Sequence, residues 1–218
     1  VFYPKALPVT ELPDEVIKLA GLITGRRNEM GWNQGNDMVD FYDMKGIVEG
    51  LLEAMQVSDY TMTRSQQPYL HPGKSCDIVV NGEVIGSFGE VHPVVQENFE
   101  LDQVTYVLEM AVEPLVASAT AVPQYKHLPK FPSMSRDIAV VVPAEVTNAE
   151  LEQVIRAHAG ELLQGVRVFD IYTGKQVAAG CKSMAFNLTY QAADRTLTDA
   201  EVDASMKKVI AEVAEAYK

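Results

Sequence analysis

The sequence predicts an α+β protein built from two domains, and two patterns support this fold class. Apolar residues at helical spacing alternate along the 218 residues with short runs rich in β-branched residues. A stretch with repeated prolines, 122–132, then separates two parts that differ in charge. We therefore expect one domain over 1–122 and a second over 123–218, each long enough to bury a modest core.

In the first part, the strongest local pattern is a β-hairpin. Residues 76–80 and 83–90 flank Asn81-Gly82, a dipeptide that readily takes the two positive φ angles of a type I′ turn. The other expected elements are strands at 16–24, 60–64 and 104–112, short helices at 93–98 and 113–117, and a tight segment at 68–73. This order predicts a mostly antiparallel sheet.

A longer helix is expected over 40–55, where apolar residues recur at helical spacing. Asp40 or Asp43 can cap its start by accepting backbone N–H bonds, and we expect these residues and Lys45 to serve capping and surface pairing rather than chemistry. Gly46 and Gly50 each cost a helix about 1 kcal/mol relative to alanine. That cost indicates close packing of the helix against a neighbour.

The second part has the order β-α-β-β-α, which is the ferredoxin-like βαββα(β) fold without its final strand. Its strands are expected at 136–142, 166–172 and 181–191, and its helices follow capping boxes at 147–150 and 198–201. Residues 183–191 alternate clearly, with Met184, Phe186, Leu188 and Tyr190 on one face and polar or small residues on the other. We expect two helices to cover the apolar face and to leave the other face open and polar. In this fold the final strand would lie beside 136–142, which is otherwise an edge strand.

The net charge differs between the two parts of the sequence, and this difference limits which part can bind a nucleic acid. Residues 1–124 contain seven Lys and Arg and 18 Asp and Glu, a net charge of −11, whereas residues 125–218 have a net charge of −1. An acidic surface repels phosphate, so the first part is a poor candidate for nonspecific nucleic-acid binding. No apolar run is long enough for a transmembrane helix, and the N-terminus does not resemble a secretory signal. Because the chain begins with Val1 rather than Met, we expect it to be part of a longer polypeptide.

No group of residues has the spacing of a catalytic or metal site. His71 and His92 each precede a proline and are expected to be turn elements rather than zinc ligands. Cys76 and Cys181 are far apart and have no CxxC partner, so we expect reduced thiols. The glycines at 82, 86 and 89 do not form a phosphate loop, because no helix N-terminus follows them directly.

Several stretches together resemble a known family, the β subunit of bacterial phenylalanyl-tRNA synthetase, over its C-terminal third. They occur in order at 39–46 (VDFYDMKG), 71–75 (HPGKS), 86–93 (GSFGEVHP), 131–139 (FPSMSRDIA), 169–174 (FDIYTG), 182–183 (KS) and 195–199 (RTLTD). The ordered set covers nearly the whole chain and is specific, although no single motif decides it.

The resemblance implies a division of labour between the two parts. Residues 1–122 would be a non-catalytic portion of a class II synthetase-like antiparallel sheet domain that packs against the catalytic α subunit in an α2β2 heterotetramer. Residues 123–218 would be the anticodon-binding domain for tRNA(Phe). The parent enzyme is cytoplasmic and uses ATP and Mg²⁺, whereas this chain alone would have no activity and no cofactor. Neither a membrane nor DNA is an expected partner.

The candidate RNA-binding residues are basic residues for phosphates and polar residues for base edges. They are Lys126, Lys130, Arg136, Lys182, Ser183 and Asn187. The alternatives are that Arg136 pairs with a carboxylate such as Asp170 and that Ser183 and Asn187 belong to an ordinary solvated face. Phe131 and Tyr172 could stack on bases, but core packing is the more frequent role of such residues.

Two other function classes remain open from the residues alone, because a fold does not determine a function. Ferredoxin-like domains also serve as small-molecule regulatory modules, and this is the main alternative. A stand-alone enzyme is disfavoured by the absence of a catalytic constellation.

Overall fold

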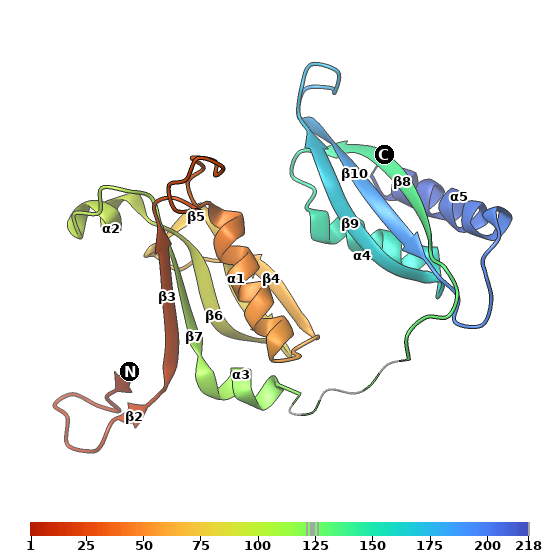
Figure 1. Ribbon diagram of the computed structural model, residues 1–218. Coiled ribbons are helices and arrows are strands. Elements are labelled where there is room, and N and C mark those ends of the chain that lie inside the picture. The colour runs from red at the N-terminus through yellow and green to blue at the C-terminus, as the bar shows by residue number, and fades with distance from the viewer. Residues whose placement is uncertain (121, 123–124, 126, 218) are drawn as a thin grey trace. The chain divides into compact units, whose positions relative to one another are not determined.

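The computed structural model describes residues 1–120, 122, 125 and 127–217 and divides into two compact units, Val1–Tyr125 and Lys126–Lys218 (Figure 1). The elements of the first unit are β1 (Phe2–Tyr3), β2 (Asp14–Glu15), β3 (Lys18–Thr24), α1 (Phe41–Ala54), β4 (Tyr60–Arg64), β5 (Leu70–Val80), β6 (Glu83–Val91), α2 (Pro93–Asn98), β7 (Thr105–Ala111) and α3 (Val112–Ser118). Those of the second are β8 (Met134–Pro143), α4 (Asn148–Ala159), β9 (Leu163–Tyr172), β10 (Cys181–Tyr190) and α5 (Asp199–Ala216). In the described part of the chain, no helix is long and apolar enough to cross a membrane.

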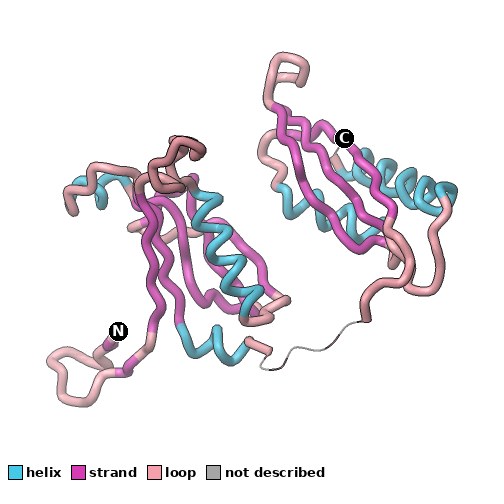
Figure 2. The backbone as a smooth tube through the Cα atoms, in the orientation of Figure 1, coloured by secondary structure: helices cyan, strands magenta, loops and turns pink. Residues whose placement is uncertain are grey.

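The first unit is a five-stranded sheet in the order β3-β7-β6-β5-β4, and every neighbouring pair is antiparallel. Helix α1 packs on one face of this sheet (Figure 2), where Met44, Val48 and Leu52 are buried against Phe88 and Leu108. The predicted hairpin is confirmed, because Asn81 and Gly82 join β5 to β6 with φ angles of 52° and 83°.

Three expectations for the first unit were wrong. The predicted tight segment at 68–73 overlaps the start of β5, which begins at Leu70 and reaches its hairpin partner through a register shift between Leu70 and Ser75. Gly46 and Gly50 are exposed, and a Cβ at either position would meet nothing within 4 Å outside its own helix backbone. Val112 starts α3 instead of ending the preceding strand.

Two of the glycines in β6 are explained by strand packing. A Cβ at Gly86 would lie 2.6 Å from the carbonyl oxygen of Glu109, and one at Gly89 would lie 2.5 Å from that of Lys74. Both obstacles are backbone atoms, which cannot rotate away. The glycines therefore allow β6 to approach the strands on either side of it.

The second unit has the three-stranded antiparallel order β8-β10-β9 with α4 and α5 on one face, which confirms the predicted ferredoxin-like arrangement. The alternation predicted for β10 is also confirmed, because Met184, Phe186, Leu188 and Tyr190 are all at most 1% exposed. These side chains pack against Leu151 and Ile155 of α4 and Val202 and Val209 of α5. Strand β8 lies at the edge of the sheet with β10 as its neighbour.

The two helices of the second unit begin at the predicted capping residues. At α4, the Glu150 amide donates to Thr147 Oγ1 over 3.3 Å and the Thr147 amide donates to the Glu150 carboxylate over 2.7 Å. At α5, the Glu201 carboxylate accepts from the amide and the hydroxyl of Thr198 at 3.0 and 2.8 Å, and Arg195 donates to it over 2.6 Å. These bonds fix where each helix starts.

The α5 cap predicts a specific contribution to acid unfolding. Hydrogen bonds from Arg195, then from Thr198, lower the pKa of Glu201 from 4.5 to about 2. A carboxylate with a lowered pKa stabilises the fold above its unfolded pKa, and this stabilisation is lost as the pH falls from about 4.5 to about 2. We therefore expect Glu201→Gln to lose less thermal stability than the wild type over that interval. Melting temperatures measured at a series of pH values test this, and an identical pH dependence in both proteins would contradict it.

Candidate nucleic-acid interface

The face of the second unit's sheet opposite its helices is the candidate interface, and strand register decides which side chains lie on it. Residues of β8 and β9 that pair with buried residues of β10 point to the sheet face covered by the helices. The residues that alternate with them point to the opposite, open face. The open face defined in this way carries Ser135, Asp137, Ala139 and Val141 of β8, Ser183, Ala185, Asn187 and Thr189 of β10, and Gly165, Arg167, Asp170 and Tyr172 of β9.

The centre of the open face is a polar row across three strands. Asn187 is paired with Asp137 on one side and with Arg167 on the other. Its side-chain amide donates to Asp137 over 2.6 Å and to Ser135 Oγ over 2.7 Å, so Asn187 is held by β8. Arg167 is exposed, and no ion pair joins it to a carboxylate among the described residues. This row therefore presents an available guanidinium beside a fixed amide.

A second row lies near one end of the open face and contains an aromatic ring. Ser183 is paired with Val141 and with Tyr172, and Tyr172 is 41% exposed. The expectation of core packing for Tyr172 was therefore wrong. A Cβ at Gly174 would overlap the Tyr172 hydroxyl, so the glycine leaves space for the ring in its present position.

Two of the predicted basic residues lie on the helix side of the sheet. Arg136 is paired with buried Leu188 and Lys182 with buried Val142. The guanidinium of Arg136 forms ion pairs with Asp199 and, at 3.4 Å, with Asp203 of α5. Arg136 therefore pairs with carboxylates, as in the alternative considered above, but the acids are Asp199 and Asp203 and not Asp170, which belongs to the opposite face.

The remaining candidates lie near the linker. Lys126 is outside the described residues. Lys130 lines a pocket beside the ends of β9 and β10, together with Gln164 and Gln191. Phe131 is half-buried, and its carbonyl accepts a hydrogen bond of 2.6 Å from the Gln191 side chain. RNA contact by each of these residues stays a prediction.

Sequence reasoning missed Arg167, although the signal was present. It stands between Val166 and Val168, which both pack on the helix-side core. An arginine between two inward-facing residues of a strand must project from the other face. The same alternation could therefore have placed Arg167 on the open face, whereas its position beside Asn187 depends on the strand register.

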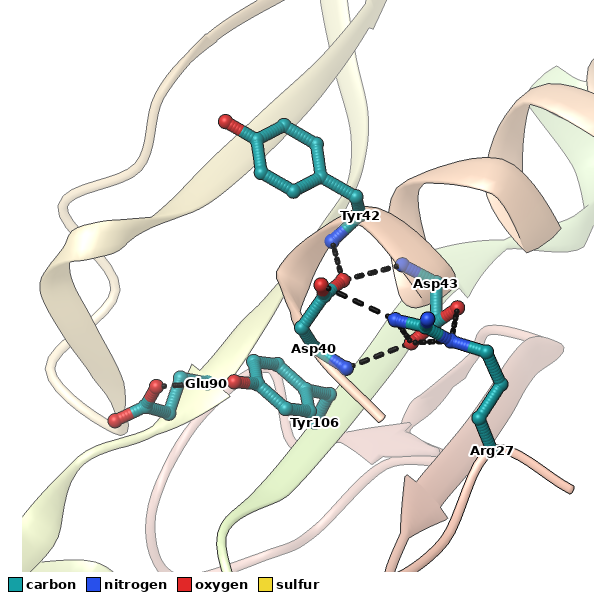
Figure 3. Close-up of polar contacts among 6 residues, drawn as sticks. All are labelled: Arg27, Asp40, Tyr42, Asp43, Glu90 and Tyr106. Atoms are coloured by element: carbon teal, nitrogen blue, oxygen red, sulfur yellow. Dashed lines mark hydrogen bonds and ion pairs between the residues drawn. The ribbon is translucent and has the colours of Figure 1, made fainter. Parts of the chain in front are cut away.

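In the first unit, the acidic residues at the start of α1 have a structural role (Figure 3). Asp40 Oδ1 accepts from the amides of Tyr42 and Asp43 at 2.7 and 3.1 Å, and Arg27 donates to Asp43 over 2.8 Å. This arginine also lowers the pKa of Asp43. Lys45 pairs with Glu49 one turn along the helix. The predicted capping and surface pairing are confirmed.

Beside this cap, the buried side chains of Glu90 and Tyr106 are hydrogen-bonded (Figure 3), and the exposed Lys74 donates to the same Glu90 oxygen. The Tyr106 hydroxyl donates to Glu90 over 3.3 Å, and Lys74 donates to the same oxygen over 2.6 Å. Burial, followed by the charge of Glu90, raises the pKa of Tyr106 to about 12. The phenol therefore remains a donor that holds Glu90 in place.

His71 and His92 each accept a local hydrogen bond, but His71 lies within β5 rather than in a turn, and His92 is the N-cap of α2. The Nδ1 atom of His71 accepts from the Gly73 amide at 3.0 Å, and that of His92 accepts from the Val94 amide at 3.2 Å. Among the described residues, no three His, Cys, Asp or Glu side chains are grouped so that they could hold a metal ion.

Comparisons with known proteins match both units. Residues 1–112 match the family described as "Phenylalanyl tRNA synthetase beta chain CLM domain", and residues 129–218 match the "Ferredoxin-fold anticodon binding domain". The "Phenylalanine--tRNA ligase beta subunit" of Symbiobacterium thermophilum is 44% identical over 88% of this chain and 22% of its own length. The proteins of the same name from Shouchella clausii and Bacillus subtilis are 41% and 40% identical, over 98% and 94% of this chain and 26% of each relative.

This chain thus spans about a quarter of the length of the curated relatives that it matches. Both matched families agree with the resemblance seen in the ordered motifs, and they cover the five-stranded unit and the ferredoxin-like unit respectively. The chain therefore belongs to the phenylalanyl-tRNA synthetase β-chain family.

Proposed function

We propose that this chain forms part of the β subunit of a cytoplasmic phenylalanine–tRNA ligase and binds the anticodon region of tRNA(Phe) through its second unit. The observation that carries the proposal is the open face of the β8-β10-β9 sheet, which offers an available cation, polar side chains and an exposed aromatic ring. Unpaired bases are commonly bound in this way, by stacking on aromatic rings and by hydrogen bonds to their edges.

Each row of the open face would have its own task. Arg167 would meet the RNA backbone, Tyr172 would stack on a base, and Ser183 would reach a base edge. Asn187 and Arg136 would support the surface from within, since Asn187 is bonded to β8 and Arg136 to α5. Lys182 lies on the helix side, so its side chain would contact a phosphate only by extending past the end of the sheet.

The first unit, residues 1–122 in this proposal, would be a scaffold for a catalytic α subunit in an α2β2 assembly. Its net charge of −11 over 1–124 disfavours a phosphate backbone as its partner. Aminoacylation with ATP and Mg²⁺ would be the task of the α subunit. No three His, Cys, Asp or Glu side chains among the described residues are grouped to hold a metal ion, so we assign none of them to Mg²⁺.

An RNA-binding measurement on the 218-residue chain tests the role of the open face. We expect saturable binding of the tRNA(Phe) anticodon hairpin, and we expect Arg167→Ala to weaken it about tenfold through loss of a charged contact. Gly174→Ala should weaken binding without lowering the melting temperature, because the new methyl group displaces only the mobile end of Tyr172. Arg64→Ala, an exposed arginine of the first unit, is the matched control and should bind normally.

Two outcomes would contradict the proposal. One is an absence of hairpin binding by the folded wild-type chain. The other is equal weakening by Arg64→Ala and Arg167→Ala, which would indicate a general charge effect. A large thermal shift with a single amino acid, together with no RNA binding, would instead favour a small-molecule regulatory module.

A further inference from the structure

A pocket of about 330 Å³ with both polar and apolar lining lies where the open face ends. Residues 127–130 form one side of it, and Gln164, Gln191 and Ala193 lie on the other. Gln191 directly follows β10 and continues the open-face series that includes Asn187 and Thr189. A strand of RNA on the open face would therefore reach this pocket without crossing the sheet.

The pocket is held together by hydrogen bonds from its own side chains. The Gln191 amide nitrogen donates to the Phe131 carbonyl over 2.6 Å. This bond connects the segment that precedes β8 to the end of β10. Gln164 is the extra residue of a β-bulge, because Thr189 pairs with Gly165 while Tyr190 pairs with Leu163. Such a bulge redirects the side chain that it contains, and here the Gln164 amide donates to the carbonyls of Glu161 and Gln191, both at 3.4 Å.

The lining matches the chemistry of a nucleobase with its phosphate. In the described part of the chain, neither side-chain carbonyl oxygen, of Gln164 or of Gln191, accepts a hydrogen bond. Both can therefore accept from a base edge, while Leu128 and Pro129 offer apolar surface to its ring. Lys130 has no carboxylate partner among the described residues and can meet a phosphate.

The size of the pocket favours a base over a larger ligand. Its volume is at the lower end of the roughly 300–1,000 Å³ typical of small-molecule sites. Resting on the proposed function, we infer that this pocket takes one unpaired nucleobase of the RNA bound to the open face, read by Gln164 and Gln191 with its phosphate on Lys130.

A filling variant of the 218-residue chain tests the inference. Ala193 is exposed at the pocket, so Ala193→Trp fills the space without removing a core contact. Gln164→Leu removes one carboxamide at nearly constant size. We expect each variant to weaken binding of the anticodon hairpin about tenfold, as for the loss of a stacked or hydrogen-bonded base. Binding of a fully paired RNA duplex should be unchanged, since its bases are not free to enter. Ala211→Trp, on an exposed position of α5, is the control and should bind both RNAs normally.

The possible outcomes distinguish base binding in the pocket from RNA binding by the open face. If Arg167→Ala weakens hairpin binding while Ala193→Trp and Gln164→Leu bind as the wild type does, the open-face function stands and the pocket inference is overturned. If the pocket variants lose hairpin and duplex binding equally, the pocket contacts the sugar–phosphate backbone of the RNA and not a base. That result also overturns the inference. If the wild-type chain binds no hairpin, the proposed function itself fails.

A second measurement needs no RNA strand. The four nucleoside monophosphates added to the isotopically labelled chain should shift the backbone amide resonances of Ala192 and Ala193, with one base saturating at the lowest concentration. Inorganic phosphate alone should shift only the signals near Lys130. Equal shifts from phosphate and from all four nucleotides would contradict a base-binding pocket.

Discussion

Replacing Phe186 with alanine is expected to lower the free energy of unfolding of the second unit by about 3–5 kcal/mol. Phe186 is fully buried at the middle of β10, between the sheet and both helices of its unit. Truncation to alanine loses the favourable free energy of burying the phenyl ring. It also leaves a cavity, because the surrounding strands and helices cannot move in to fill it. A loss of this size is a large share of the about 5–15 kcal/mol that stabilises a typical domain. Urea unfolding monitored by circular dichroism would measure it.

Phe169 provides the matched control for this substitution. It is also a phenylalanine in a strand of the same sheet, but it is 52% exposed at the second β-bulge of β9, opposite Ala185 and Phe186. Phe169→Ala should therefore change the unfolding free energy by no more than about 0.5 kcal/mol. Similar losses in both variants would show that the apolar core described for the second unit is not what stabilises it.

Replacing Gly89 with alanine is expected to destabilise the first unit by about 3 kcal/mol. The added Cβ would lie 2.5 Å from the Lys74 carbonyl oxygen and 2.6 Å from the Ser75 Cα, so β5 and β6 would have to separate. The φ angle of 156° at this position adds backbone strain for any other residue. Overpacking by one methyl group typically costs about 1–3 kcal/mol, and a rigid backbone obstacle places this case at the upper end. Thermal and urea unfolding would report the loss.

Gly46→Ala is the control, because it makes the same chemical change in open space. Gly46 is exposed in the interior of α1, and nothing would lie within 4 Å of its Cβ beyond the helix's own backbone. Alanine is the better helix former by about 1 kcal/mol, so this variant should be more stable than the wild type. A Gly89→Ala variant that is at least as stable as the wild type would contradict the close approach of β5 and β6.

Local patterns in the sequence predicted most of the fold. The Asn81-Gly82 turn, the capping box at Thr147 and the alternation along β10 are decided by residues that are neighbours in sequence or one helical turn apart. The two-residue strands β1 and β2 were missed, because their pairing depends on a contact between short segments that carry no periodicity. The start of β5 was missed because proline and glycine within 68–73 indicate a turn.

The candidate site was predicted less completely, because it depends on side chains that are distant in sequence. Which acid pairs with Arg136 is determined by the packing of α5 on β8, and no sequence spacing gives that. The exposure of Tyr172 likewise depends on its place in the second row and on the space left by Gly174. Arg167 could have been found from alternation alone, whereas the pocket beside Gln191 required knowledge of where the linker passes.

The ion pairs of Arg136 limit the counterion release expected for RNA bound to the open face as proposed. Arg136 is engaged by two carboxylates and Lys182 lies on the helix side, so among the described residues the cations proposed to meet phosphate on the open face and at its pocket are Arg167 and Lys130. Each neutralised phosphate of a single strand contributes about −0.7 to the slope of log K against log salt concentration, so two contribute about −1.4. A fourfold rise in salt then weakens binding by only about sevenfold. Recognition by this surface would rest on bases more than on charge, and it would persist in salt that dissociates most protein–nucleic acid complexes.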